Sequence, residues 1–209
     1  MKTKDKYQKA FAVFRKYHQE VPLEVFGSDP YKTLVSTLLS ARTNDDTTLP
    51  VSNRLFQKAP DIAALDAMTQ EEIQRIIYPV GFYKTKAKHL KQTARIIMTK
   101  HYSNIPKTRV ELEELPGVGR KTANLVLARA FGQAEISVDT HVHRISNMLG
   151  WVSTDDPIQT ERKLRRILPR KYWPDVNRLM VGLGRQFRSK KKLYEFLQEQ
   201  ELIKKISMR

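Results

Sequence analysis

Two glycines bracket a short turn that leads into a basic segment. The order is Leu115-Pro116-Gly117-Val118-Gly119-Arg120-Lys121-Thr122-Ala123. Pro116 ends one helix, the glycines permit a tight turn, and a second helix is predicted to begin at Arg120. Backbone N–H groups at such a turn point outward together and suit a phosphate, which can come close where side chains are missing. The alternative is a plain connection between helices, which the basic residues after the turn disfavour.

Two ionisable residues near this turn, an amine and a carboxylate, have side chains that can take part in catalysis. Lys121 stands at the start of the second helix, and by its type alone it is expected to contact a phosphate. Asp139 lies eighteen residues farther on (139 − 121), just before a helix that begins near Thr140. That place is typical of a helix N-cap, where a carboxylate stays ionised.

The charge of the chain indicates its class of partner. Among 209 residues, Lys and Arg number 38 and Asp and Glu 22, so the formal net charge is 38 − 22 = +16. Such a charge favours a polyanion, with nucleic acid as the first expectation and a solubilising surface as the alternative. No apolar run is long enough to span a membrane and no signal peptide is visible. We therefore expect a monomer in the cytoplasm, associated with the nucleoid.

Hydrophobic residues recur at helical spacing almost throughout, and alternating strand patterns are missing. One start is strongly marked, because Thr69 followed by Glu72 forms a capping box. The sequence therefore predicts an all-α fold. The predicted helices cover residues 3–20, 31–41, 43–58, 69–78, 83–101, 108–114, 120–131, 140–150, 157–168, 171–182 and 191–205.

Three further segments accompany the glycine turn in a fixed order. Their sequences are LLSARTND at 38–45, GFYKTKA at 81–87 and VDTHVHR at 138–144. With the turn, they resemble the endonuclease III family of the helix–hairpin–helix superfamily, over residues 25–190. The resemblance implies two helical domains with a DNA-binding cleft between them. Residues 23–133 would form a six-helix barrel with the hairpin, and residues 1–22 and 134–209 the second domain.

The resemblance also implies an activity. It is that of a bifunctional DNA glycosylase and abasic-site lyase of base excision repair, acting on oxidised pyrimidines in duplex DNA. Two alternatives stay open: a glycosylase for thymine or uracil opposite guanine, and a non-catalytic module that binds DNA lesions. The expected partner is double-stranded DNA that carries damaged bases or abasic sites.

Residue roles follow from the aligned motifs. Lys121 would be the nucleophile that forms a Schiff base, and Asp139 the aspartate that stabilises charge as the base leaves. Arg42 and Phe82 would fill the gap left by a flipped nucleotide, although Arg42 replaces a family glutamine and Phe82 could instead be a core aromatic. Ser40 and Asp45 would flank the substrate pocket, with a helix cap as the other reading of Asp45. The remaining DNA contacts would be Gly117, Val118, Gly119, Arg120, Thr122, Lys84, His141 and Arg144.

Metal chemistry is not indicated. The chain has no cysteine, so the 4Fe–4S cluster of many family members cannot form, and Arg188 stands where its first cysteine would be. His141 and His143 diverge at a helix start and lack a third ligand. The expected cofactor is none, apart from a monovalent cation that the resemblance allows at the hairpin. We expect the helix at 191–205 to replace the cluster through a purely hydrophobic contact with the N-terminal helix at 3–20.

Overall fold

The computed structural model describes residues 3–187 and 189–204, and every regular element in those ranges is a helix. The all-α prediction is therefore confirmed. None of the described helices is long and apolar enough to cross a membrane. The chain divides into two compact units, Pro22–Gln133 and Met1–Val21 with Ala134–Arg209. We call them the hairpin unit and the terminal unit, and describe each by itself.

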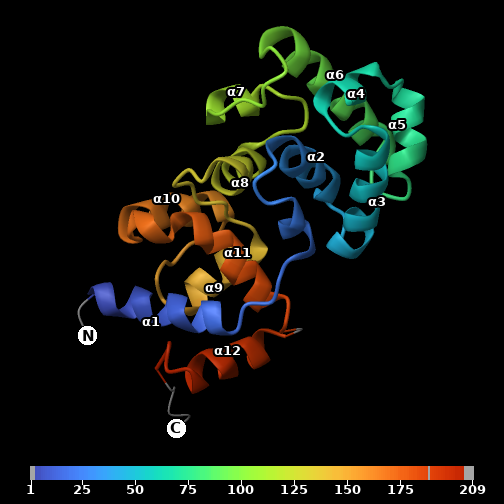
Figure 1. Cartoon of the computed structure of the whole chain (residues 1–209). Coiled ribbons are helices and arrows are strands. Elements are labelled where there is room, and N and C mark those ends of the chain that lie inside the picture. The colour runs from blue at the N-terminus through green and yellow to red at the C-terminus, as the bar shows by residue number, and fades with distance from the viewer. Residues whose placement is uncertain (1–2, 188, 205–209) are drawn as a thin grey trace. The chain divides into compact units, whose positions relative to one another are not determined.

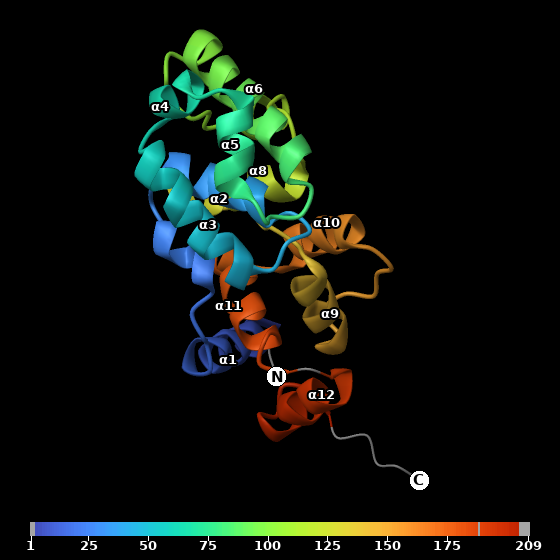
Figure 2. The ribbon, with the colours of Figure 1, turned by 90° about the vertical axis from the view of Figure 1, so that its right-hand side faces the viewer.

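The hairpin unit is built around α2, most of whose residues are buried, and the long helix α6, which buries one face. Figure 1 shows α2 beside α8, and Figure 2 shows α4 and α5 beside α6. The buried face of α6 carries Leu90, Ala94 and Ile97, none of which is exposed to solvent. The elements of this unit are η1 (Pro22–Phe26), α2 (Pro30–Ser40), α3 (Asp45–Lys58), α4 (Ile62–Ala67), α5 (Gln70–Ile77), α6 (Tyr83–Lys100), α7 (Arg109–Glu113) and α8 (Arg120–Phe131).

Side-chain caps fix where these helices begin. The backbone N–H of Glu72 donates to Thr69 Oγ1 at 3.2 Å and that of Thr69 donates to Glu72 Oε2 at 2.7 Å, so the capping box is confirmed. Asp61 caps α4, a six-residue helix that the sequence did not predict because it is too short to show a period. Pro50 lies inside α3 without ending it.

The terminal unit surrounds a core of aromatic rings. Phe11 stacks on Tyr172 with ring centroids 4.2 Å apart, and Tyr7 meets Trp151 edge to face at 5.0 Å. Figure 1 shows α1 crossing α11 in this unit. Its elements are α1 (Thr3–Lys16), α9 (Thr140–Met148), α10 (Pro157–Ile167), η2 (Arg170–Tyr172), α11 (Trp173–Gly184) and α12 (Lys190–Glu199).

The last helix and the residues after it pack on the first helix and the residue after it, and the contact includes an ion pair, so it is not the purely hydrophobic contact that we expected. Phe196 of α12 meets Tyr17, just after α1, edge to face at 5.1 Å and lies 5.0 Å from Phe187. Lys9 of α1 forms an ion pair with Glu201 at 2.6 Å. The helix ends at Glu199, earlier than predicted, and position 205 lies outside the described residues. The chain beyond the helix still packs on the core through Leu202 and Ile203.

We predict that this contact stabilises the terminal unit. Leu193 and Leu197 of α12 are completely buried, and replacing a buried Leu by Ala costs about 2–5 kcal/mol. A chain that ends at Phe187 should therefore lose the melting transition of this unit, and Leu197→Ala should lower the unfolding free energy by about 3 kcal/mol. Thermal melting followed by circular dichroism measures both. Lys191→Ala, at an exposed position of the same helix, is the control, and an unchanged melt of the shortened chain would contradict the prediction.

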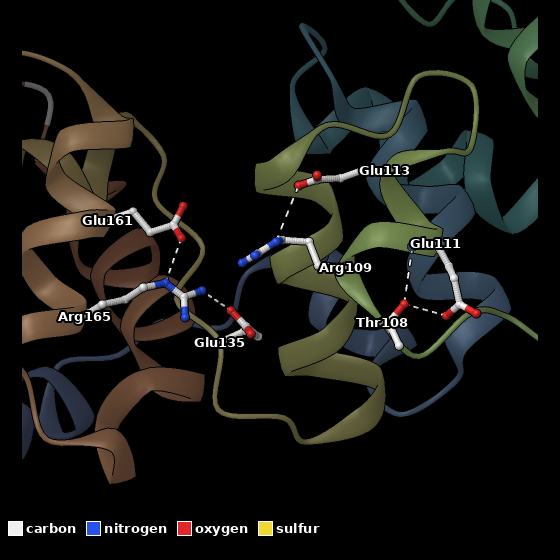
Figure 3. A network of polar contacts seen from close by, with 7 residues as sticks. All are labelled: Thr108, Arg109, Glu111, Glu113, Glu135, Glu161 and Arg165. Atoms are coloured by element: carbon white, nitrogen blue, oxygen red, sulfur yellow. Dashed lines mark hydrogen bonds and ion pairs between the residues drawn. The ribbon is translucent and has the colours of Figure 1, made fainter.

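Six basic residues lie between positions 162 and 171, and one of them, Arg165, is not exposed to solvent as the others are. Figure 3 shows Arg165 between Glu161 and Glu135 within the terminal unit. Its Nε donates to Glu161 Oε1 at 2.8 Å, its terminal nitrogen pairs with Glu135, and its guanidinium lies 5.1 Å from the centroid of the Trp173 ring. Arg165 is therefore neutralised inside the unit. The exposed cations among the six are Arg162, Lys163, Arg166, Arg170 and Lys171.

Candidate functional site

The glycine turn forms a hairpin between α7 and α8. Leu115 and Val118 point into the core, and the N–H of Val118 donates to the carbonyl of Leu115 at 3.0 Å, which closes the turn. Gly117 has a φ of +81°, a conformation that L side chains rarely adopt. Gly119 is the N-cap of α8 and brings no capping side chain. Among the described residues, no side chain caps the start of α8, and an anion bound there stays a prediction.

A cavity of about 290 Å³ joins this hairpin to two loops of the same unit. The first loop, residues 41–44, follows α2 and carries Arg42. The second, residues 78–82, precedes α6 and carries Phe82. The cavity is lined by Leu38, Ala41, Arg42, Phe82, Thr85, Lys86, His89 and Gly117. Segments that are far apart in the sequence therefore meet at one surface of the hairpin unit.

Arg42 and Phe82 are presented to solvent. Phe82 is 61% exposed, so the reading of this residue as a core aromatic is wrong. Both residues have positive φ, 54° for Arg42 and 59° for Phe82, which is uncommon for residues other than glycine. The Arg42 guanidinium lies 5.6 Å from the centroid of the Phe82 ring. An exposed aromatic ring and a cation side by side have the shape and polarity to enter a gap in a base stack.

Lys86, for which the sequence predicted no role, is one of the residues that line this cavity. Its ammonium is buried and donates to the carbonyls of Leu39 and Ala41 and to Thr43 Oγ1. Burial lowers the pKa of Lys86 to about 8. One signal for burial was present in the sequence. Lys86 precedes Leu90 by four residues and Ile97 by eleven, so it falls on the apolar stripe of α6.

The two predicted catalytic residues come from different units. Lys121 is exposed in the first turn of α8, directly after the hairpin. Asp139 is the N-cap of α9 in the terminal unit, and its Oδ1 accepts from the N–H of Val142 at 2.9 Å, which confirms the N-cap reading. The Asp139 carboxylate thus lies at the positive end of the α9 helix dipole.

The predicted pocket residues Ser40 and Asp45 flank the Arg42 loop. The hydroxyl of Ser40 donates to the carbonyl of Thr37 at 2.9 Å within its own helix. Asp45 is the first residue of α3, and the cap of that helix is Asn44, whose side chain accepts from the N–H of Thr47 at 2.7 Å. The reading of Asp45 as the helix cap is therefore wrong. Its role at the pocket stays a prediction.

Other predicted DNA contacts are distributed over both units. Arg120 and Thr122 are half-buried in the first turn of α8, and Lys84 is exposed in the first turn of α6. In the terminal unit, Arg144 lies 3.3 Å from both His141 Nδ1 and the carbonyl of Gly184. No metal-holding group of three His, Asp or Glu side chains occurs among residues 3–187 and 189–204.

The hairpin glycines give a matched pair of variants. A Cβ at Gly117 would lie 2.7 Å from His89 Nδ1, on a backbone whose φ is already unfavourable for L residues. Gly117→Ala should therefore cost about 1–3 kcal/mol of stability and weaken DNA binding. A Cβ at Gly119 would meet nothing within 4 Å, so Gly119→Ala should lose only the roughly 0.5–1 kcal/mol by which alanine is the poorer N-cap. Equal melting temperatures for the two variants would contradict the prediction, and fluorescence anisotropy with a labelled duplex measures binding.

Comparisons with known proteins identify the family to which the chain is similar. A family model for HhH-GPD superfamily base excision DNA repair proteins matches residues 35–170. Endonuclease III of Thermotoga maritima is 42% identical over 159 residues, which cover 76% of this chain and 75% of that protein. Endonuclease III-like protein 1 of Mus musculus is 41% identical over 75% of this chain and 53% of its own length. A trapped endonuclease III–DNA covalent intermediate superposes with a TM-score of 0.79 at 31% identity, over 91% of this chain and 90% of that one.

Proposed function

Because the chain belongs to the endonuclease III family, whose members are base excision repair glycosylases of the HhH-GPD superfamily, we propose that it excises oxidised or ring-saturated pyrimidines from duplex DNA and then cleaves the abasic site. The observation that carries this proposal is the place of Lys121, an exposed amine in the first turn of α8 beside a hairpin open to phosphate. The similar structure of a trapped covalent intermediate with DNA supports a covalent route.

The proposed chemistry uses the Lys121 amine twice. In its neutral form it attacks C1′ of the damaged nucleoside, and the bond from C1′ to the base breaks with its electron pair leaving on the base. The attacking nitrogen then carries two protons, one of which passes to the departing base. The sugar ring opens as O4′ takes up a proton from water, which leaves a protonated imine between Lys121 and C1′. The imine acidifies the proton on C2′. Removal of this proton expels the 3′ phosphate, and water then hydrolyses the imine and restores the amine.

Asp139 and the basic residues have supporting roles in this proposal. The Asp139 carboxylate stabilises the positive charge that develops at C1′ as the base departs. The open amides of the hairpin bind a phosphate of the DNA backbone, and the net charge of +16 favours association with a polyanion. Arg42 and Phe82 occupy the gap in the base stack, where the Arg42 guanidinium donates hydrogen bonds to the unpaired base.

A panel of duplexes tests the proposal. Each duplex carries one site: a ring-saturated pyrimidine, an oxidised pyrimidine, thymine or uracil opposite guanine, an abasic site, or no damage. Base release and strand breaks are measured separately by chromatography and denaturing gels. We expect release and breakage at the damaged pyrimidines and breakage at the abasic site. Excision confined to the guanine mismatches would contradict the proposed substrate, and tight lesion binding without any release would contradict enzymatic function.

A further inference from the structure

The ammonium of Lys86 is the most fully enclosed cationic group at the cavity. Its residue is only 7% exposed, and Nζ lies 2.7 Å from the carbonyl oxygen of Leu39, 2.6 Å from that of Ala41 and 3.0 Å from Thr43 Oγ1. An ammonium group has three protons to donate, and each of these acceptors can take one. Three hydrogen bonds thus hold Lys86 in place, unlike Lys84 and Lys88 of the same helix, which are exposed.

These acceptors belong to the end of α2 and to the loop that follows it. The last carbonyls of a helix have no partner within the helix and carry its partial negative charge. Lys86 satisfies the carbonyls of Leu39 and Ala41 from outside, since α2 ends at Ser40. Arg42 lies directly between the residues that Lys86 binds and has a positive φ. The bonds of Lys86 therefore fix the backbone on both sides of Arg42.

The same hydroxyl that accepts from Lys86 also holds the Phe82 loop. Thr43 Oγ1 accepts from the backbone N–H of Gly81 at 3.1 Å. The two loops are in close contact at this point, because a Cβ at Gly81 would lie 3.1 Å from the carbonyl oxygen of Arg42. Arg54 binds the other end of the Phe82 loop by donating to the carbonyls of Ile76 and Tyr78. Lys86 and Thr43 thus form one polar junction between both loops.

We propose that Lys86 is a positioning residue that acts through Thr43 to hold Arg42 and Phe82 at the spacing needed to fill the gap beside a flipped nucleotide, an inference that rests on the function proposed above. Lys86 itself touches neither the reacting sugar nor the base. Its contribution is to keep two left-handed loop residues in one arrangement before DNA arrives. Misplacement of such groups by about 1 Å can cost roughly 100-fold in rate.

Lys86→Met tests the inference, with Lys91→Met as the matched control. Both lysines lie on α6, and Lys91 also binds a backbone carbonyl, that of Asp66, away from the two loops. The readouts are kcat and KM for base release and the fluorescence of 2-aminopurine placed opposite the damaged base, which brightens when its stacking is broken. We expect Lys86→Met to lower kcat by about 100-fold with little change in KM, and to lose most of the brightening. Lys91→Met should keep both.

A second pair of variants keeps the test valid where Lys86→Met fails to fold. Thr43→Val removes the hydroxyl that joins the loops, whereas Thr43→Ser retains it. Thr43→Val should lose brightening and kcat, and Thr43→Ser should restore both. Folded Lys86→Met or Thr43→Val variants with wild-type brightening and kcat would overturn the inference. So would losses that Lys91→Met shares to the same extent. A wild-type protein that releases no base from any duplex would instead refute the proposed function.

Discussion

Lys121→Ala is expected to abolish the covalent adduct that borohydride traps between the protein and DNA containing an abasic site. Borohydride reduces an imine to a stable amine, so the adduct reports the Schiff base directly. Alanine has no nucleophile, and the removal of a covalent catalyst costs about 10³-fold or more in rate. The measurement is the fraction of labelled DNA that migrates with the protein on a denaturing gel, together with the rate of base release.

Lys121→Arg is the matched control for binding. The guanidinium keeps the positive charge for a phosphate contact, but it stays protonated and forms no imine. We expect this variant to bind the duplex nearly as the wild type does, without trapping or base release. If Lys121→Ala were trapped at the wild-type yield, the nucleophile would have to be another amine of the chain. If Lys121→Ala lost DNA affinity but kept base release and trapping, Lys121 would be a phosphate contact and not the nucleophile.

Asp139→Asn should separate the two roles of this residue. An asparagine side chain caps a helix about as well as an aspartate, so the bond to the N–H of Val142 persists and the melting temperature stays near the wild-type value. The negative charge is lost. In the proposed mechanism this charge stabilises the transition state in which the base departs, so base release should fall by about 10²–10³-fold. Asp139→Ala loses the cap as well and should cost an additional ~1 kcal/mol of stability.

The abasic-site substrate sharpens this second prediction. Its base is already absent, so cleavage needs the Lys121 imine but no stabilisation of a departing base. Asp139→Asn should therefore impair strand cleavage at an abasic site much less than base release from a damaged pyrimidine. Parallel assays on the two duplexes measure the ratio. Equal losses on both substrates would contradict the assigned role, and unchanged base release would leave Asp139 as a helix cap alone.

Short-range features of the fold were predictable because their partners are close in sequence. The capping box joins Thr69 to Glu72, three residues away, and the cap of α9 joins Asp139 to Val142 in the same way. The glycine hairpin was also recognisable, since few residues other than glycine accept the φ of +81° at Gly117. These features depend on residues that are neighbours in the sequence, so they can be recognised from the sequence alone.

The junction between the two loops was not predictable for the opposite reason. The acceptors of Lys86 lie 43 to 47 residues before it, and no local pattern links them to α6. The positive φ of Arg42 and Phe82 is likewise set by tertiary contacts, because neither residue type favours it. The sequence left Phe82 open as a core aromatic, since only the folded chain decides which side of a loop is exposed.

The order in which the ribosome makes the chain has a consequence for the terminal unit. Lys9 and Glu201, which form an ion pair, are 192 residues apart in the sequence. The whole hairpin unit is therefore synthesised between the two segments of the terminal unit. Domains generally fold as units during synthesis, so the hairpin unit can fold first. The apolar side chains of α1, Tyr7, Phe11 and Phe14, lack their packing partners on α11 and α12 until these helices have been synthesised. We expect nascent chains halted after Gln133 to contain a protease-resistant hairpin unit and an unfolded α1 that is available to chaperones.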